Sequence, residues 1–403
     1  MQTGQTIRGA THLAFDAVEQ VTHIVEGMYR NISAAPLPFG AEPEGPARGI
    51  AGLVHEIIRR VNGGVREISE LALAPLSSHL DGFFPPGPQR EAVAALLNGV
   101  CGDHLERTEN PLAIPLQFRT FHEKDAEPVD LRAAVEPGSP FQPSSRVLVL
   151  AHGLCMNDRH WTWEGHDHGQ MLAERFGYTP VYLRYNSGRH VSANGRALSS
   201  ALAELLDTWP TEIESITLLG FSMGGLVTRA ALQVGEEEKN AWVSHVDKAV
   251  YVGTPHHGAA LERGGFHLQR VAGFSPYTAP LAALGRIRSD GITDLRHGNI
   301  RAEDWHHHDP HEDNADHRRP SPLAEGIAHY AIAGTLSEEK SQPADRLLGD
   351  GLVHPESGLG RHADPEKTLR FPAEHVRIVY GRAHLGLLHD PEVAQTLRTW
   401  LTR

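Results

Sequence analysis

Residues 220–224 read Gly-Phe-Ser-Met-Gly, so that a serine stands two residues from a glycine on either side. The mostly apolar residues 216–219 before it are typical of a buried strand, and a helical pattern follows Met223. A turn that lifts a serine off the end of a strand strains its backbone and crowds the neighbouring chain, which glycines relieve. It also exposes the hydroxyl at a helix N-terminus, where the helix dipole favours developing negative charge. We therefore predict that Ser222 is the nucleophile of an acyl-transfer reaction.

The sequence His-Gly-Leu at residues 152–154 directly follows the apolar run of residues 147–151. Acyl transfer needs two backbone N–H groups directed at the developing oxyanion. One normally comes from the residue after the nucleophile, here Met223, and the other from the loop after an earlier strand, here Leu154. We expect His152 to support this loop rather than act as a base, and we count it among the residues that line the substrate site.

Four segments, in this order, resemble bacterial lipases and esterases of the α/β-hydrolase fold: residues 152–154, 220–225, 253–258 and 349–353. The chain is most similar to the group that resembles the inositol-deacylating PGAP-type hydrolases, over roughly residues 111–403. The resemblance implies a serine carboxylic-ester hydrolase, an esterase or lipase. The chain departs from the pattern at Phe221, where many relatives carry histidine, and we expect this side chain to pack against the sheet.

In this fold the catalytic acid and then the histidine base follow the serine along the chain. Asp350 lies between two glycines and matches the D-G-x-V pattern of the family, whereas its neighbour Asp345 has no turn glycine. His384 follows the last predicted strand and matches the H-L-x-L-L pattern of the family. The rival His389 directly precedes the start of the last helix. We therefore predict a Ser222–Asp350–His384 triad.

Short apolar strands alternate with helices over most of the chain, which predicts an α/β fold with a mostly parallel sheet covered by helices on both faces. The expected strands are residues 146–151, 180–185, 215–220, 248–253, 329–333 and 376–380, and the expected helices are residues 168–176, 194–209, 223–234 and 391–401. An antiparallel hairpin of residues 115–121 and 129–135 is expected to precede them. These elements form the predicted catalytic domain, residues 111–403.

The first part of the chain, residues 1–110, is predicted to be a helical region. Apolar residues recur at helical spacing in residues 14–28 and 54–68, and a short helix is expected at residues 91–100. A layer packed on the main domain is the favoured interpretation. A helix lying on a membrane surface is the alternative, but the acidic residues on the polar side of the first helix would be repelled by anionic lipid.

The alternation fails between residues 261 and 322, which we interpret as a cap inserted over the active site. Phe266, Phe274 and Tyr277 are its candidate substrate-binding residues. The His-rich residues 305–313 offer metal-binding side chains but repeat no fixed ligand spacing, so we expect a solvated loop and no metal site. No cofactor is expected either, because the proposed triad and oxyanion hole suffice for ester hydrolysis.

The overall composition excludes several other classes of protein. The 403 residues include 37 Lys and Arg against 50 Asp and Glu, a net charge of −13, which disfavours binding to nucleic acid. No apolar run is long enough to span a membrane, although peripheral membrane contact is compatible with the sequence. We expect a cytoplasmic protein, because residues 1–14 lack the apolar core of a signal peptide, and the two cysteines cannot form a disulfide framework.

The expected partner is an ester or lipid-like small molecule. A polyester or polyhydroxyalkanoate depolymerase, an amidase and an acyltransferase use the same triad, and substrate selectivity resides in the cap and pocket. Dehalogenases and epoxide hydrolases of this fold place aspartate where this chain has Ser222. A non-catalytic binding protein that kept the fold is the alternative from a different class, and it would be marked by a missing triad residue.

Overall fold

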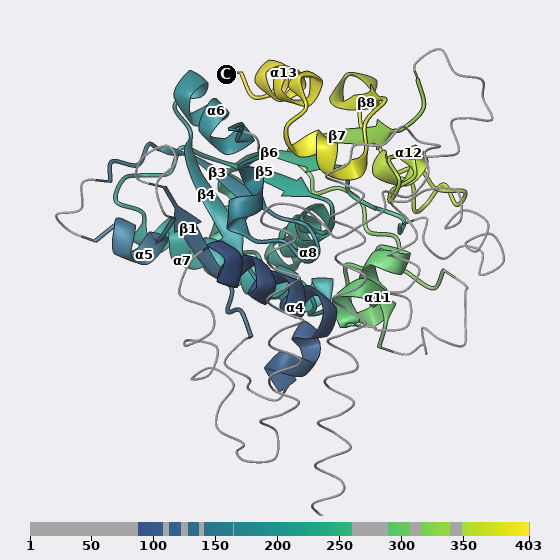
Figure 1. Cartoon of the computed structure of the whole chain (residues 1–403), viewed down its shortest axis with the longest axis horizontal. Helices are drawn as coiled ribbons and strands as arrows, with labels where there is room; N and C mark the ends of the chain where they lie inside the picture. The colour runs from purple at the N-terminus through teal and green to yellow at the C-terminus, as the bar shows by residue number, and fades with distance from the viewer. Residues whose placement is uncertain are drawn as a thin grey trace, which may run out of the picture.

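A computed structural model describes residues 88–107, 113–121, 128–136, 141–163, 165–259, 289–306, 316–338 and 349–402. An eight-stranded sheet with the order β2-β1-β4-β3-β5-β6-β7-β8 forms its centre (Figure 1). The strands are β1 (Gln117–Thr120), β2 (Val129–Asp130), β3 (Arg146–Ala151), β4 (Thr179–Arg184), β5 (Ser215–Phe221), β6 (Val246–Val252), β7 (Ala328–Thr335) and β8 (Val376–Tyr380).

Only β1 runs against its neighbours β2 and β4 in this sheet, and all the other pairs of neighbouring strands are parallel. This is the α/β-hydrolase arrangement that the sequence predicts. The chain passes from β3 outward to β4 and then returns to β5 on the other side of β3. Ligands of open parallel sheets bind at the carboxyl ends of the strands near such a reversal.

Helices cover both faces of the sheet. The helices in the described part of the chain are α4 (Pro88–Arg107), α5 (Leu131–Ala134), α6 (His168–Phe176), α7 (Val191–Thr208), α8 (Met223–Glu237), α11 (Asp290–His297), α12 (Pro355–Gly358) and α13 (Pro391–Trp400). Short 3-10 helices are η1 (Asp158–Trp161), η2 (Ala241–His245), η4 (Ala302–Asp304), η6 (Ala373–His375) and η7 (His384–Leu388).

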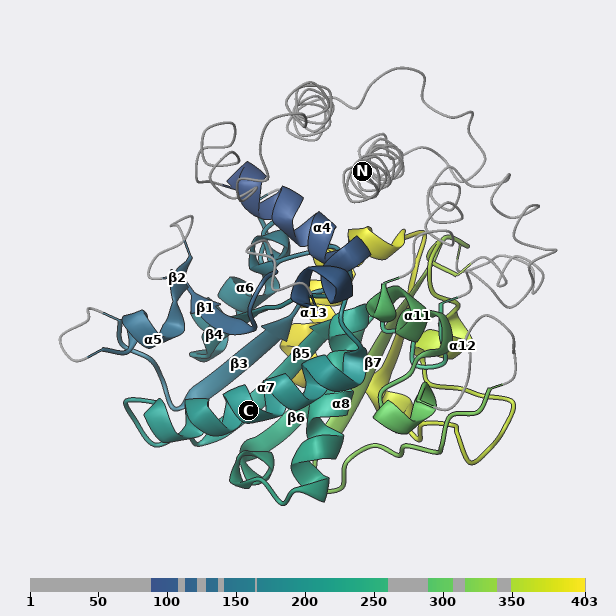
Figure 2. The same cartoon turned by 90° about the horizontal axis from the view of Figure 1, so that it is seen from below.

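Strand β3 is apolar on both faces of the sheet because each face packs against a separate hydrophobic core. Its Val147 and Val149 belong to the core that contains residues of α7 and α8, whereas Leu148 and Leu150 belong to the core that contains residues of α6 and α13. Figure 2 shows α7 and α8 together on one side of the sheet. Successive side chains of a strand point to opposite faces, so an unbroken apolar run indicates a strand buried on both sides.

The predicted hairpin is confirmed in its pairing but is wrong in part of its extent. Strands β1 and β2 pair antiparallel, as expected. Residues 131–134, predicted as strand, form helix α5 instead, because the Asp130 carboxylate accepts a hydrogen bond from the backbone N–H of Arg132 and caps the helix. The short helix expected at residues 91–100 is the middle of the longer α4. The patterns at residues 14–28 and 54–68 lie outside the described residues.

Candidate active site

Ser222 occupies a strained turn between β5 and α8. Its backbone angles are φ 53° and ψ −123°, a conformation that side-chain-bearing residues rarely adopt. The backbone N–H of Ser222 donates to the carbonyl of Val252 at 2.8 Å, which fixes the turn to the end of β6. Strain of this kind gathers at functional sites, and here it holds a half-buried serine at the start of a helix.

The glycines around Ser222 are required by close backbone contacts. A Cβ atom on Gly220 would lie 2.4 Å from the Cα atom of Gly225, and one on Gly224 would lie 2.0 Å from the carbonyl oxygen of Ala151. Both distances are shorter than real Cβ contacts. The turn therefore packs directly against the end of β3, where the loop of residues 152–157 begins.

Asp350 and His384 form a buried pair. The Nδ1 atom of His384 lies 2.7 Å from the Oδ2 atom of Asp350, and their side chains are 5% and 1% exposed. The other carboxylate oxygen of Asp350 accepts hydrogen bonds from the backbone N–H groups of Leu352 (3.0 Å) and Val353 (2.8 Å). The carboxylate is thus held in a turn and directed at the imidazole.

The imidazole of His384 lies beside the serine turn. Ring centroids of His384 and Phe221 are 5.0 Å apart, and a Cβ atom on Gly253 would lie 3.0 Å from the Cε1 atom of His384. Phe221 precedes Ser222, and Gly253 follows Val252, which accepts the Ser222 N–H. The Nε2 atom of His384 is buried and has no hydrogen-bond partner within the described part of the chain. The arrangement leaves this atom available to a group at the serine turn.

Backbone hydrogen bonds beyond the regular strands connect the predicted triad residues. The N–H of Gly253 donates to the carbonyl of Ile332 on β7, and the N–H of Leu336, just after β7, donates to the carbonyl of Gly349. The N–H of His384 donates to the carbonyl of Asp350 at 3.0 Å. The carboxyl ends of β5, β6 and β7 therefore join Ser222 to Asp350 and His384 through main chain alone.

The segment that carries His384 is also supported from α6. The Nε2 atom of His168, the first residue of α6, donates to the carbonyl of Leu387 in η7 at 3.1 Å, while its Nδ1 atom faces the Nε2 atom of His166 at 2.8 Å. Burial lowers the pKa of His168 to about 3, so that this imidazole stays neutral. The rival base His389 stacks on Trp163 with ring centroids 6.1 Å apart.

The two predicted oxyanion donors are the residue after Ser222 and the residue after Gly153, which lies beside Ser222. Met223 is the first residue of α8, so its N–H has no partner within that helix. A Cβ atom on Gly153 would lie 3.2 Å from the Cβ atom of Ser222, which places the loop of residues 152–157 next to the serine. Leu154, half-buried, is the next residue in this loop.

Hydrogen bonding within residues 152–157 leaves Leu154 as the available donor among residues 154–157. The N–H of Cys155 donates to the Ser187 hydroxyl, that of Met156 to the carbonyl of Gly153, and that of Asn157 to the Nδ1 atom of His160. The N–H of Leu154 has no such partner in the part of the chain that the structure describes. The role predicted for Leu154 requires a backbone N–H of this kind, one that makes no hydrogen bond within the protein.

His152 lies beneath this loop. Its side chain is fully buried, its ring stacks on Tyr185 at 4.3 Å, and the Tyr185 hydroxyl donates to the carbonyl of His152 at 2.7 Å. Burial lowers its pKa to about 3. The geometry is that of a neutral support for the loop, and it offers no exposed surface for the substrate contact that the sequence suggested.

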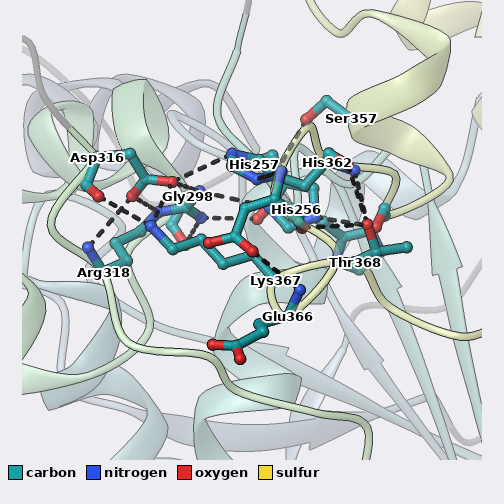
Figure 3. A network of polar contacts seen from close by, with 12 residues as sticks. His256, His257, Gly298, Asp316, Arg318, Ser357, His362, Glu366, Lys367 and Thr368 are labelled. Atoms are coloured by element: carbon teal, nitrogen blue, oxygen red, sulfur yellow. Dashed lines mark hydrogen bonds and ion pairs between the residues drawn. The ribbon is translucent and has the colours of Figure 1, made fainter.

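The histidines of the Gly-Thr-Pro-His-His-Gly segment are held in a polar network (Figure 3). Arg318 donates to the carbonyl of His256 at 3.0 Å and pairs with Asp316, while the Nη2 atom of Arg318 lies 3.3 Å from the Nδ1 atom of His257. Lys367 also pairs with Asp316, at 3.2 Å. The sequence does not predict this role of Arg318, because Arg318 reaches His256 across 62 positions and such a contact leaves no local pattern.

Phe266, Phe274 and Tyr277 lie outside the described residues, as does most of the His-rich segment. No group of three His, Cys, Asp or Glu side chains in the described ranges is arranged to hold a metal ion. In the same ranges no helix is both long enough and apolar enough to cross a membrane.

Comparison with known protein families finds one matching family model. Residues 146–317 match the model of the PGAP1-like alpha/beta domain. No curated protein matches the chain. Similar solved structures include the mature lipase BlEst2 of Bacillus licheniformis, with 17% identity, 66% of this chain and 95% of that chain covered, and a TM-score of 0.42. An esterase of Pyrobaculum calidifontis has 15% identity over 82% of this chain and 97% of that chain, with a TM-score of 0.41.

Proposed function

We propose that this chain, whose residues 146–317 match the model of the PGAP1-like alpha/beta domain, is a serine carboxylic-ester hydrolase with Ser222 as nucleophile, His384 as base and Asp350 as the acid that orients the base. The observation that carries the proposal is the buried Asp350–His384 pair, 2.7 Å apart, whose imidazole packs beside the strained serine turn. The sequence offers a candidate for each triad position, whereas a binding protein that had lost activity would lack one.

The proposed reaction has two halves. In the first, the Nε2 atom of His384 accepts the proton of the Ser222 hydroxyl as its oxygen attacks the ester carbonyl, and the same proton then passes to the leaving alcohol. In the second, water gives a proton to Nε2 and attacks the acyl-serine, which releases the carboxylic acid and restores the Ser222 hydroxyl. Asp350 holds the proton on Nδ1 and stabilises the imidazolium in both halves.

The N–H groups of Leu154 and Met223 stabilise the oxyanion of each tetrahedral intermediate. They belong to the backbone and are fixed before substrate arrives, so that little reorganisation is needed when charge develops. The N-terminus of α8 adds its dipole at the same place. Substrates are ester or lipid-like molecules, as the names lipase and esterase of the similar structures suggest.

Hydrolysis of p-nitrophenyl esters of increasing chain length, combined with a serine-directed phosphonate probe, tests the proposal. The wild-type protein is expected to hydrolyse at least the short esters and to carry the probe on Ser222. Ser222→Ala is expected to abolish labelling and to lower kcat by several orders of magnitude. Ser200→Ala, which changes an exposed serine on α7, is the matched control. Labelling of another residue in equal yield, or ester hydrolysis that survives Ser222→Ala, would contradict the proposal.

A further inference from the structure

Helix α4 packs against the segment that carries the predicted oxyanion donor Leu154, here called the oxyanion loop (residues 152–157). A Cβ atom on Gly99 of α4 would lie 2.3 Å from the Sγ atom of Cys155 and 2.8 Å from both its Cα and its N atom. Two of these three contacts are with main chain, so a side chain on Gly99 would have to displace the loop or the helix. Cys155 directly follows Leu154, and its φ of 59° shows that the turn is already strained.

The same turn of α4 is fixed from its other sides. The hydroxyl of Ser289 donates to the carbonyl of Gly99 at 2.8 Å, and the backbone N–H of Ile114 donates to the side-chain oxygen of Asn98 at 2.8 Å. Ser289 is the N-cap of α11, which lies beside α4 in both views (Figures 1 and 2). Since α4 is held in place, a larger residue at position 99 would move the oxyanion loop.

Glu91, near the start of α4, forms a second link to the oxyanion loop. Its carboxylate pairs with Arg184 at 2.7 Å, with Arg119 at 3.0 Å and with Arg159. Arg159 lies in η1, which begins directly after the oxyanion loop. Burial would raise the pKa of Glu91, but the three guanidinium groups outweigh it and lower the pKa to about 2. The carboxylate is therefore charged at neutral pH and holds α4 to η1, β4 and β1.

We propose that α4 positions the oxyanion hole, with Gly99 and Glu91 as positioning residues that act through the backbone of Leu154. Neither residue is placed to touch the substrate. The proposal rests on the proposed function, because it concerns the stabilisation of an oxyanion that exists only during acyl transfer. A displaced N–H group weakens binding of the transition state while leaving binding of the ground-state ester nearly unchanged.

The test compares kcat and KM for a short p-nitrophenyl ester with the inhibition constant of a trifluoromethyl ketone, whose adduct with the serine places an oxyanion in the hole. Gly99→Ala in the full chain is expected to lower kcat roughly 10- to 100-fold, to weaken the ketone by the same factor and to leave KM within about twofold. Glu91→Gln, which adds no atom to α4, is expected to change the same two quantities by a smaller factor. If Gly99→Ala does not fold, the Glu91→Gln variant alone tests whether α4 positions the oxyanion hole.

Gly195→Ala is the matched control. A Cβ atom there would lie 2.4 Å from the Cβ atom of Ala230, between α7 and α8. It is expected to lower Tm without changing kcat or the inhibition constant. The inference would be overturned, and the proposed function left intact, if a folded Gly99→Ala or Glu91→Gln protein had the wild-type kcat and the wild-type inhibition constant. A loss of kcat without weaker binding of the ketone would have the same meaning. A wild-type protein without Ser222-dependent hydrolysis would overturn both.

Discussion

His384 and Asp350 are joined twice, once through their side chains and once through their main chains. The Nδ1 and Oδ2 atoms are 2.7 Å apart, and the backbone N–H of His384 donates to the backbone carbonyl of Asp350 at 3.0 Å. The main-chain bond fixes the separation of two residues that are 34 positions apart in sequence. The imidazole therefore keeps Nδ1 toward the carboxylate, and the proposed chemistry of the pair depends on the charge of Asp350.

Asp350→Asn is expected to lower kcat by about 10³- to 10⁴-fold with little change in KM. The asparagine oxygen can still accept from Leu352 and Val353, but its NH₂ group then faces Nδ1 and stabilises the tautomer that has its proton on Nε2. Steady-state kinetics with a short ester measure the effect. Asp345→Asn, at the rival aspartate, is expected to behave as wild type; the opposite result would move the acid to Asp345.

His384→Ala is expected to remove hydrolysis, whereas His389→Ala is expected to keep most of it. His389 stacks on Trp163 and contributes no predicted proton transfer. The rate of phosphonate labelling of Ser222 gives a second measure, because it depends on activation of the serine hydroxyl. A large loss in His389→Ala with an active His384→Ala protein would exchange the two assignments.

Gly224→Ala is expected to destabilise the fold by about 3 kcal/mol, because its Cβ atom would lie 2.0 Å from the carbonyl oxygen of Ala151. Denaturant unfolding followed by circular dichroism measures the change. Gly177→Ala is the control, since Gly177 has φ +70° but nothing within 4 Å of the added atom. It is expected to cost only about 1 kcal/mol, for the backbone conformation alone. Equal losses in both variants would show that the contact with β3 is unimportant.

The ion pairs of Glu91 are expected to make the stability of the fold depend on pH. Its pKa is about 2 in the folded protein against an ordinary value near 4.5, so its ion pairs stabilise the fold fully above about pH 4.5 and progressively less as pH falls toward 2. The difference in Tm between wild type and Glu91→Gln is expected to be largest at neutral pH and to shrink over that interval. A difference that does not change between pH 7 and pH 2 would show that the carboxylate charge contributes nothing.

The predicted cap is expected to select the acyl chain length of the substrate, and enzyme kinetics test this. Ala in place of Phe266, Phe274 or Tyr277 is expected to change the preferred acyl chain length while Ser222 still reacts with a small phosphonate. The ratio of kcat/KM for long and short esters is the measurement. Ratios that match the wild type in all three variants would place these side chains away from the acyl pocket.

Local chemistry explains which features the sequence predicted. The serine turn depends on glycines that are adjacent in the chain, and Asp350 lies between Gly349 and Gly351, both with positive φ. Strand β3 is visible as an unbroken apolar run. Such features concern residues within a few positions of one another, so their patterns are visible without a structure.

The features that were missed depend on residues far apart in the chain. Glu91 meets Arg184 across 93 positions and Arg119 across 28, and the number and type of these residues do not show which charges pair. The predicted hairpin includes residues 131–134, but these residues form a helix that is capped by Asp130. Tertiary contacts and caps therefore limited the prediction more than the periodicity of the chain did.

The main-chain hydrogen bonds that connect Ser222 through β6 and β7 to Asp350 have a consequence for inactivation by heat. Residues linked through neighbouring strands of one buried sheet open together, in the same cooperative unit, rather than one at a time. Thermal inactivation is therefore expected to coincide with melting of the sheet itself, and the serine turn is not expected to be lost while the rest of the sheet survives.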